Sequence, residues 1–323
     1  MPALPLLNSA FDLITVTFIS TLIILSVLSL CFIFHLNFKS KSLTHLRGFN
    51  SIWTVRFLLV LFIFFWSIIE LLRIPFFRRR YLYPFLPSFS ISQQTEFCKL
   101  NVFLSLGFFE PAFLVTLLFL LSASIKKKTP NDTWAITFVF LTCLPVTTLQ
   151  GLLIYFNPLL NKIPLPFRQI VKVIDDGFGN DTVLCGYPFL NSVAFAGFGI
   201  GYCFWFLFSC WRVLTLVINK GLRVRIYALA TTILFALPLQ IMALGLTTFF
   251  KPDEDFFGVI SLLGFLGAFF CAVSGEGILV IKPISDALDA GVNCCKWSSR
   301  NREMKRLSET ETERRAEVGE ERV

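Results

Sequence analysis

One carboxylate lies inside an apolar segment and directly before a proline: Glu110 and Pro111, in the stretch QQTEFCKLNVFLSLGFFEPAF, residues 93–113. An ionised acid is costly inside a membrane, so Glu110 should face the interior of a helix bundle and be either neutral or partnered. The proline cannot donate a backbone hydrogen bond and disfavours the carbonyl one turn earlier, so we expect a bend there. The dipeptide therefore indicates a hinge or a polar pocket, although a satisfied structural carboxyl would carry the same pattern.

Few other polar side chains interrupt the apolar segments. If its segment begins near residue 98, Glu110 lies about twelve residues, or roughly 18 Å, inside it and close to the bilayer midplane. Arg56 and Glu276 should share a depth near the inner surface, where they are placed to form an interhelical ion pair. Such a pair would act as a switch or simply set the register of two helices. In the sixth segment, Gln240 follows the mid-span proline Pro238 in LFALPLQIM.

The composition predicts that a membrane bundle positions these residues. Hydrophobic residues make up 55% of the 323 residues, charged residues only 15%, and the mean hydropathy is +0.71, whereas soluble chains are about a quarter charged. Continuous apolar runs exclude a β-barrel, whose strands alternate over about ten residues. We expect an all-α polytopic membrane protein, a seven-transmembrane helix bundle within residues 1–283. The expected spans are about 11–36, 51–72, 98–125, 134–156, 190–215, 226–250 and 256–282.

Basic residues near the span ends predict the orientation. With the N-terminus outside, 14 Lys and Arg flank the spans on the inner side and 9 on the outer side, which favours this orientation; the triplet Arg78–Arg80 opposes it. Residues 284–323 should form a cytosolic tail, with a short amphipathic segment and then a largely disordered part. The protein should be integral to the plasma membrane or another membrane of the secretory pathway.

Two sequons are placed in loops on opposite sides of the membrane. Asn131 lies after the third span, and Asn180 lies between the fourth and fifth. Only one of them can face the compartment where glycans are added. In the orientation above that residue is Asn180, although a tripeptide of this kind also arises by chance.

Cysteines in the outer segments predict a disulfide. Only Cys98, at the outer end of the third span, and Cys185, in the loop before the fifth, lie on the oxidising side in this orientation, where disulfides persist. A bridge between them would pin a long loop over the mouth of the bundle. The alternative is two unpaired thiols.

A disulfide in this place resembles the plan of the G-protein-coupled receptors. Pro238 in the sixth span is similar to that plan, and ISDALDAGVNCCKW after the seventh looks like its short membrane-lying helix. The resemblance makes Cys294 and Cys295 candidates for palmitoylation. The third span ends LLSASIKKK without the Asp/Glu-Arg-Tyr triplet, and the seventh reads AVSGEGILVIKP without Asn-Pro-x-x-Tyr. The rhodopsin-like activation switch is therefore not carried over.

Along its whole length the architecture is similar to the plant seven-span proteins called candidate G-protein-coupled receptors, including the style of HLRGFNSIWTVRFLLVLF in spans one and two. The resemblance implies a receptor-like signalling protein that couples to a heterotrimeric G protein through basic inner loops and answers to an unknown ligand. The alternatives are a small-solute or proton-coupled transporter and a non-catalytic membrane scaffold. We also expect the lipid bilayer as a partner. We expect no binding to nucleic acid, because the basic residues cluster at span ends.

Enzyme classes find little support in the sequence. It has only two histidines and lacks the His-Glu-x-x-His, P-loop and Gly-x-Ser-x-Gly motifs, so we expect neither catalysis nor a metal or other cofactor. Gly197 and Gly201 have the spacing that lets membrane helices approach closely. We expect them to pack inside the bundle; a homo-oligomer through this face is the alternative.

Overall fold

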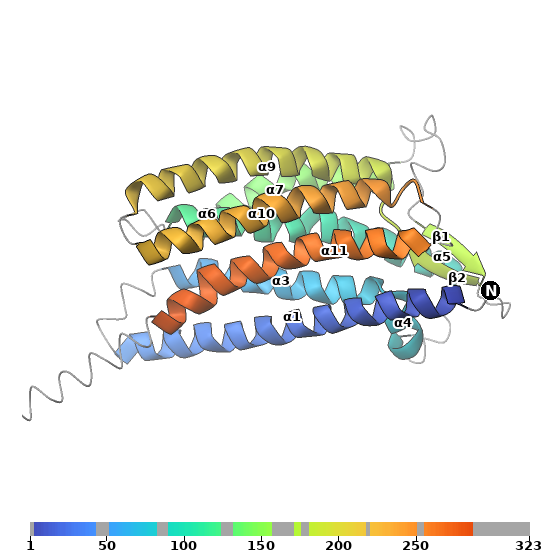
Figure 1. Ribbon diagram of the computed structural model, residues 1–323, viewed down its shortest axis with the longest axis horizontal. Helices are drawn as coiled ribbons and strands as arrows, with labels where there is room; N and C mark the ends of the chain where they lie inside the picture. The colour runs from blue at the N-terminus through green and yellow to red at the C-terminus, as the bar shows by residue number, and fades with distance from the viewer. Residues whose placement is uncertain are drawn as a thin grey trace, which may run out of the picture.

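The structure is a computed structural model, and it describes residues 3–42, 52–82, 90–123, 132–156, 171–175, 181–217, 220–250 and 255–286. Seven of its helices are long and apolar enough to cross a membrane, and they lie side by side along the long axis (Figure 1). The predicted all-α polytopic bundle is therefore confirmed. The elements are α1 Ala3–Ser42, α3 Trp53–Arg73, α4 Pro75–Phe77, η2 Arg78–Leu82, α5 Ile91–Val102, η3 Phe103–Phe109, α6 Glu110–Ala123, α7 Asp132–Tyr155, β1 Val171–Asp175, β2 Asp181–Cys185, α9 Phe189–Leu216, α10 Lys220–Leu246, α11 Asp255–Glu276 and η5 Gly277–Ile281.

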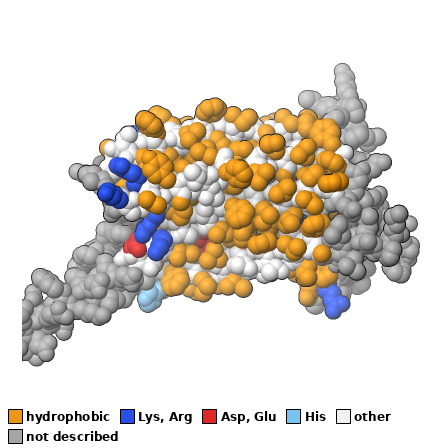
Figure 2. All heavy atoms as spheres, viewed as in Figure 1, with side chains coloured by type: hydrophobic (Ala, Val, Ile, Leu, Met, Phe, Trp, Pro, Cys, Tyr) orange, Lys and Arg blue, Asp and Glu red, His pale blue; other side chains and the backbone are white. Residues whose placement is uncertain are grey.

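The sides of the bundle carry a surface suited to lipid. Large apolar side chains such as Phe204, Trp211 and Phe235 are more than two-thirds exposed. Figure 2 shows hydrophobic side chains over most of the visible side, with the Lys and Arg side chains toward its ends. Because water would disfavour so much exposed apolar surface, these sides belong in the hydrocarbon core of a bilayer.

The third span lies at the centre of the bundle. It runs without interruption through α5, η3 and α6, and almost every residue of α6 is buried. Around it, α10 packs along α11, α1 packs on α3, and α3 packs on α6. A central helix has no lipid-facing side, so any polar group on α6 must find its partners within the protein.

The third span begins seven residues earlier than the apolar pattern predicted. Ser90 accepts a hydrogen bond from the backbone of Gln93, and the Gln93 side chain accepts one from the backbone of Ser90. This capping box starts the helix at Ile91. The extra turns lengthen the third span before Glu110, which lies level with Trp66 on α3 and Gln240 on α10.

A β-hairpin covers one end of the bundle, which we call the hairpin end. Strands β1 and β2 are antiparallel, with Val171 opposite Cys185 and Asp175 opposite Asp181. The N-terminus of α1 lies at the same end (Figure 1). The sequence predicted only a long loop between the fourth and fifth spans. The N-terminus, Cys98 and Cys185 therefore share one side, as predicted; its identity as the outer side stays a prediction.

The expected packing role of Gly197 and Gly201 is wrong. A Cβ added at either position would meet no atom within 4 Å, and both residues lie on the exposed side of α9. The close approach occurs at Gly199, where an added Cβ would lie 2.5 Å from Ile241 Cδ1. Gly197 and Gly201 face away from the neighbouring helices because each lies two residues, or about 200° around the helix, from the packed Gly199.

Several predicted sites lie outside the described residues: the sequons at Asn131 and Asn180, the cysteines Cys294 and Cys295, and the tail beyond Asp286. The seventh span itself continues through η5 to Asp286, three residues past the predicted end of the bundle at residue 283.

Candidate functional site

Glu110 is buried in a set of hydrogen bonds that come from three other elements. Trp66 Nε1 on α3 lies 3.1 Å from Glu110 Oε1, and Ser105 Oγ on η3 lies 3.3 Å from the same oxygen. Gln240 Nε2 on α10 donates to Glu110 Oε2 over 2.6 Å. Glu110 is only 3% exposed. The sequence predicted an interior carboxyl that is either neutral or partnered, and the structure places Glu110 inside the bundle with hydrogen-bond partners; one of them, Gln240, was among the candidates.

The proline after Glu110 explains the local shape of the third span. Segment η3 is a π-helix, and the backbone N–H of Glu110 bonds to the carbonyl of Ser105, five residues earlier. Pro111 has no N–H, so the carbonyl of Gly107 loses its helical partner. Thr147 Oγ1 on α7 instead donates to Gly107 O over 2.7 Å. The wide turn brings Ser105 and Glu110 to the same side, where an α-helix would place them about 140° apart.

A second buried carboxylate, Glu70, lies beside Glu110. Arg73 Nε pairs with Glu70 Oε2 at 2.9 Å, and both Ser105 Oγ and Tyr187 OH bond to Glu70 Oε1, at 2.8 and 2.9 Å. The Arg73 guanidinium also lies 4.6 Å from the centre of the Tyr187 ring. Burial raises the pKa of Tyr187 well above its usual range, so its hydroxyl remains a donor to Glu70.

These groups line one wall of a small pocket near the hairpin end. The cavity is small, about 10 Å³, which is room for about one water molecule. Its polar wall is formed by Trp66, Glu70, Arg73, Glu110, Tyr187 and Gln240. The other lining residues are mostly apolar and come from the end of α10, the turn after it and α11: Leu244, Thr247, Ile260, Ser261, Gly264, Phe265 and Ala268. A ligand larger than a water molecule would need these helices to separate; a polar end and an apolar body would then suit this lining.

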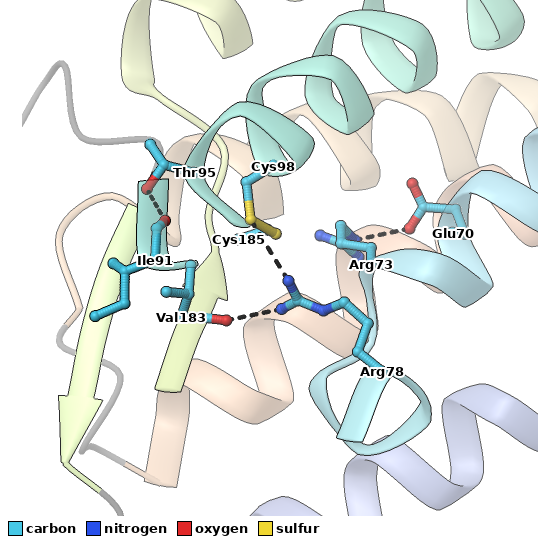
Figure 3. Close-up of a disulfide and its surroundings, with 8 residues drawn as sticks. All are labelled: Glu70, Arg73, Arg78, Ile91, Thr95, Cys98, Val183 and Cys185. Carbon is cyan, nitrogen blue, oxygen red and sulfur yellow. Dashed lines mark hydrogen bonds and ion pairs between the residues drawn. A yellow bond between two sulfur atoms is a disulfide. The ribbon is translucent and has the colours of Figure 1, made fainter. Parts of the chain in front are cut away.

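The predicted disulfide joins the hairpin to the third span, close to the pocket residue Tyr187. Cys98 and Cys185 are bonded, with their Cα atoms 5.3 Å apart, and Tyr187 follows only two residues later. Figure 3 shows Arg78 reaching beneath the bridge, where its Nη2 donates to Val183 O over 2.7 Å and its Nη1 lies 3.8 Å from Cys98 Sγ. The disulfide and Arg78 thus join three elements at one point: the hairpin, the third span and η2.

Arg78 has a different role from the one its sequence position suggested. The triplet Arg78–Arg80 was counted as loop charge against the predicted orientation. Arg78 is only 1% exposed, and its guanidinium is used inside the protein. A buried, bonded arginine is part of the fold rather than a flanking charge, so the triplet opposes the N-outside orientation less than its sequence implied.

The predicted ion pair between Arg56 and Glu276 does not form. Within the described part of the chain, Ser26 Oγ on α1 donates to Glu276 Oε2 over 3.1 Å, and no ion pair joins Glu276 to Arg56. At this opposite end, Arg225 on α10 pairs with Asp286 at 2.6 Å. Sharing a depth did not place Arg56 and Glu276 together, because depth says nothing about which helices are neighbours.

Ser105, Trp66 and Tyr187 belong to the site, but the sequence analysis did not single them out. Ser105 joins only because of the π-turn. Tyr187 carried one signal: it stands two residues after a cysteine predicted to be bridged. Trp66 resembles any other aromatic residue of an apolar span, and only its indole N–H distinguishes it.

Comparison with protein families gives a match that covers all seven spans. The model of a family described as "Uncharacterised conserved protein UCP031277" matches residues 1–293. No curated protein matches the chain. The matched region includes every residue of the pocket and the disulfide. The chain therefore belongs to the family of uncharacterised conserved proteins UCP031277.

Proposed function

We propose that this protein is a receptor-like seven-transmembrane protein that binds a small ligand in the pocket at the hairpin end. The observation that carries the proposal is the pocket itself, which is lined by the buried carboxyl groups of Glu70 and Glu110 and by the half-buried Arg73. Charged groups inside a membrane bundle are expensive and usually mark a binding site or an ion pathway. The bonded hairpin above the pocket supports a preformed site, since it limits the motion of Tyr187.

Helix α10 could carry a conformational change from the pocket to the opposite end of the bundle. Gln240 contacts Glu110 at the pocket, and Pro238 lies two residues away, where it removes a backbone hydrogen bond and weakens the helix. At the far end, the Arg225–Asp286 ion pair joins α10 to the last residue described in the seventh span. Both side chains are partly exposed, at 32% and 46%, so this pair is weak. The ion pair would therefore add little resistance if a ligand that moves Gln240 displaced that end of α10.

A heterotrimeric G protein is the partner we propose for the opposite end. Arg212, Lys220, Arg223 and Lys282 are exposed there, and the resemblance to candidate plant receptors implies such a partner. The proposed N-outside orientation puts this end in the cytosol.

Proton-coupled transport is the second candidate, because a protonatable carboxyl lies inside the bundle next to the pocket. The two functions differ in what passes through the bundle. A transporter must open the pocket to both sides in turn, whereas a receptor passes only a change of shape.

Nucleotide exchange on a Gα subunit tests the receptor. The full chain, in lipid nanodiscs, is mixed with Gα, and binding of a fluorescent GTP analogue is followed. Ser261→Phe should fill the pocket and change the exchange rate, while Leu263→Phe, on the lipid side of the same helix, should leave it unchanged. If the protein has no effect on Gα, and proteoliposomes with an internal pH dye show proton influx that Glu110→Gln abolishes, transport replaces signalling.

A further inference from the structure

The hydroxyl of Ser105 touches two carboxyl groups at once. Its Oγ lies 2.8 Å from Glu70 Oε1 and 3.3 Å from Glu110 Oε1. Ser105 is fully buried, and the two glutamates are 2% and 3% exposed. A hydroxyl carries one hydrogen, so it can donate to only one of these oxygens. The shorter contact identifies Glu70 as its acceptor.

The other contact then needs a hydrogen from elsewhere. If both glutamates were ionised, a lone pair of Ser105 would face a carboxylate oxygen of Glu110, and neither atom would have a hydrogen to offer. A proton on Glu110 Oε1 removes the conflict, because it can be donated to Ser105 Oγ while Ser105 donates to Glu70. Gln240 still donates to the second oxygen of Glu110.

The charges around Glu70 and Glu110 also require one proton on the two carboxyl groups. Arg73 is paired with Glu70, and the other polar groups that face the two glutamates carry no charge. They are Trp66 on α3, Tyr187 before α9, Gln240 on α10, Thr247 in the turn after α10, and Ser261 on α11, with the thiol of Cys271 on α11 also close enough to interact with Glu110. Among the described residues, two carboxyl groups therefore share one guanidinium. A buried charge left without a partner is strongly unfavourable.

We propose that Glu110, Ser105 and Glu70 form a binding site for a single proton, with the proton held on Glu110 and passed as a hydrogen bond through Ser105 to the ionised Glu70. This site is independent of the function proposed above, since it follows from the contacts among the side chains alone. A cation that enters the pocket would favour release of the proton from Glu110. Ligand binding and proton release would then be reciprocally linked.

Infrared spectroscopy tests this site on the full chain in lipid nanodiscs at neutral pH. The C=O stretch of a protonated carboxyl lies apart from the bands of carboxylates and peptide groups. We expect such a band in the wild type, its loss in Glu110→Gln, and a shift to higher frequency in Ser105→Ala, where the hydrogen bond to the hydroxyl is gone. Glu96→Gln, on the exposed part of α5, is the matched control and should change nothing.

Two further variants keep the test decisive. Glu276 is a third buried carboxyl, so Glu276→Gln identifies any band that belongs to it. If Glu110→Gln does not fold, Glu110→Asp retains a carboxyl and should move the band rather than remove it. The proposal is overturned if no protonated carboxyl band responds to substitution of Glu110, or if Ser105→Ala leaves the frequency of that band unchanged.

Discussion

Replacing Gly267 by alanine should destabilise the bundle beside the pocket. A Cβ built on Gly267 would lie 2.6 Å from Gln240 Cβ and 2.7 Å from the backbone carbonyl oxygen of Ala236. The carbonyl belongs to the α10 backbone and cannot turn aside like a side chain. Helices α10 and α11 must therefore separate by several tenths of an ångström, and Gln240 moves with α10.

The size of the effect follows from two opposing terms. Overpacking of this kind costs about 1–3 kcal/mol, while alanine in place of glycine favours a helix by roughly 0.5–1 kcal/mol. Gly245 on α10 supplies the matched control, because an added Cβ there meets nothing within 4 Å. Both variants gain the same helix preference, so the difference between Gly267→Ala and Gly245→Ala should be the steric cost alone, about 1–3 kcal/mol.

Thermal unfolding of the purified variants in one detergent, followed by tryptophan fluorescence, measures this difference. We expect Gly245→Ala to unfold at or slightly above the temperature of the wild type. Gly267→Ala should unfold lower, by on the order of 5 °C. If Gly267→Ala unfolds together with Gly245→Ala, α10 and α11 are not in contact as described, and the placement of Gln240 against Glu110 is wrong.

Three other predictions test the surroundings of the site by the same unfolding assay. Thr147→Val should lower the free energy of unfolding by about 1–3 kcal/mol, because it leaves the Gly107 carbonyl unpaired. The loss should be much smaller in a Pro111→Ala background, where residue 111 regains an N–H. Equal losses in both backgrounds would contradict the explanation of the π-turn. Arg78→Ala should cost about 1–3 kcal/mol, since the Val183 carbonyl loses its donor, whereas Arg80→Ala, in the same turn and exposed, should cost nothing measurable. Because the pKa of Tyr187 is raised in the folded protein, the unfolded chain loses the phenol proton first as the pH rises past about 10, and stability falls. Tyr187→Phe should weaken this alkaline loss, and an unchanged pH slope would refute the burial of the hydroxyl.

The sequence predicted the helices well because span length and apolar composition are local properties. The fifth span, expected at about 190–215, is Phe189–Leu216, and the second and fourth agree as closely. The third span was misplaced at its start because its first turns are polar and depend on a cap at Ser90 rather than on apolarity. The hairpin was missed, although VKVID and DTVLC flank a glycine-containing turn segment, a signal typical of hairpins.

The site was predicted only where a residue is unusual in itself. A carboxyl inside an apolar run attracts attention wherever it lies, so Glu110 and Gln240 were identified, and the cysteines followed from their shared side. Arg56 and Glu276 were equally unusual, but their pairing required knowledge of which helices are neighbours. Ser105 and Tyr187 were invisible because serine and tyrosine are common at span ends and their roles come from distant contacts.

The dipeptide Glu110–Pro111 accounts for more of this architecture than its two side chains. The proline removes one N–H, and the helix responds with a π-turn that places Ser105 next to Glu110. The carbonyl freed at Gly107 is then bonded by Thr147, which fastens α7 to the third span. A π-turn costs regular hydrogen bonding and persists where neighbours compensate for it. Here the compensation comes from the same contacts that assemble the two carboxyl groups, so the irregularity in the helix and the polar site have one cause.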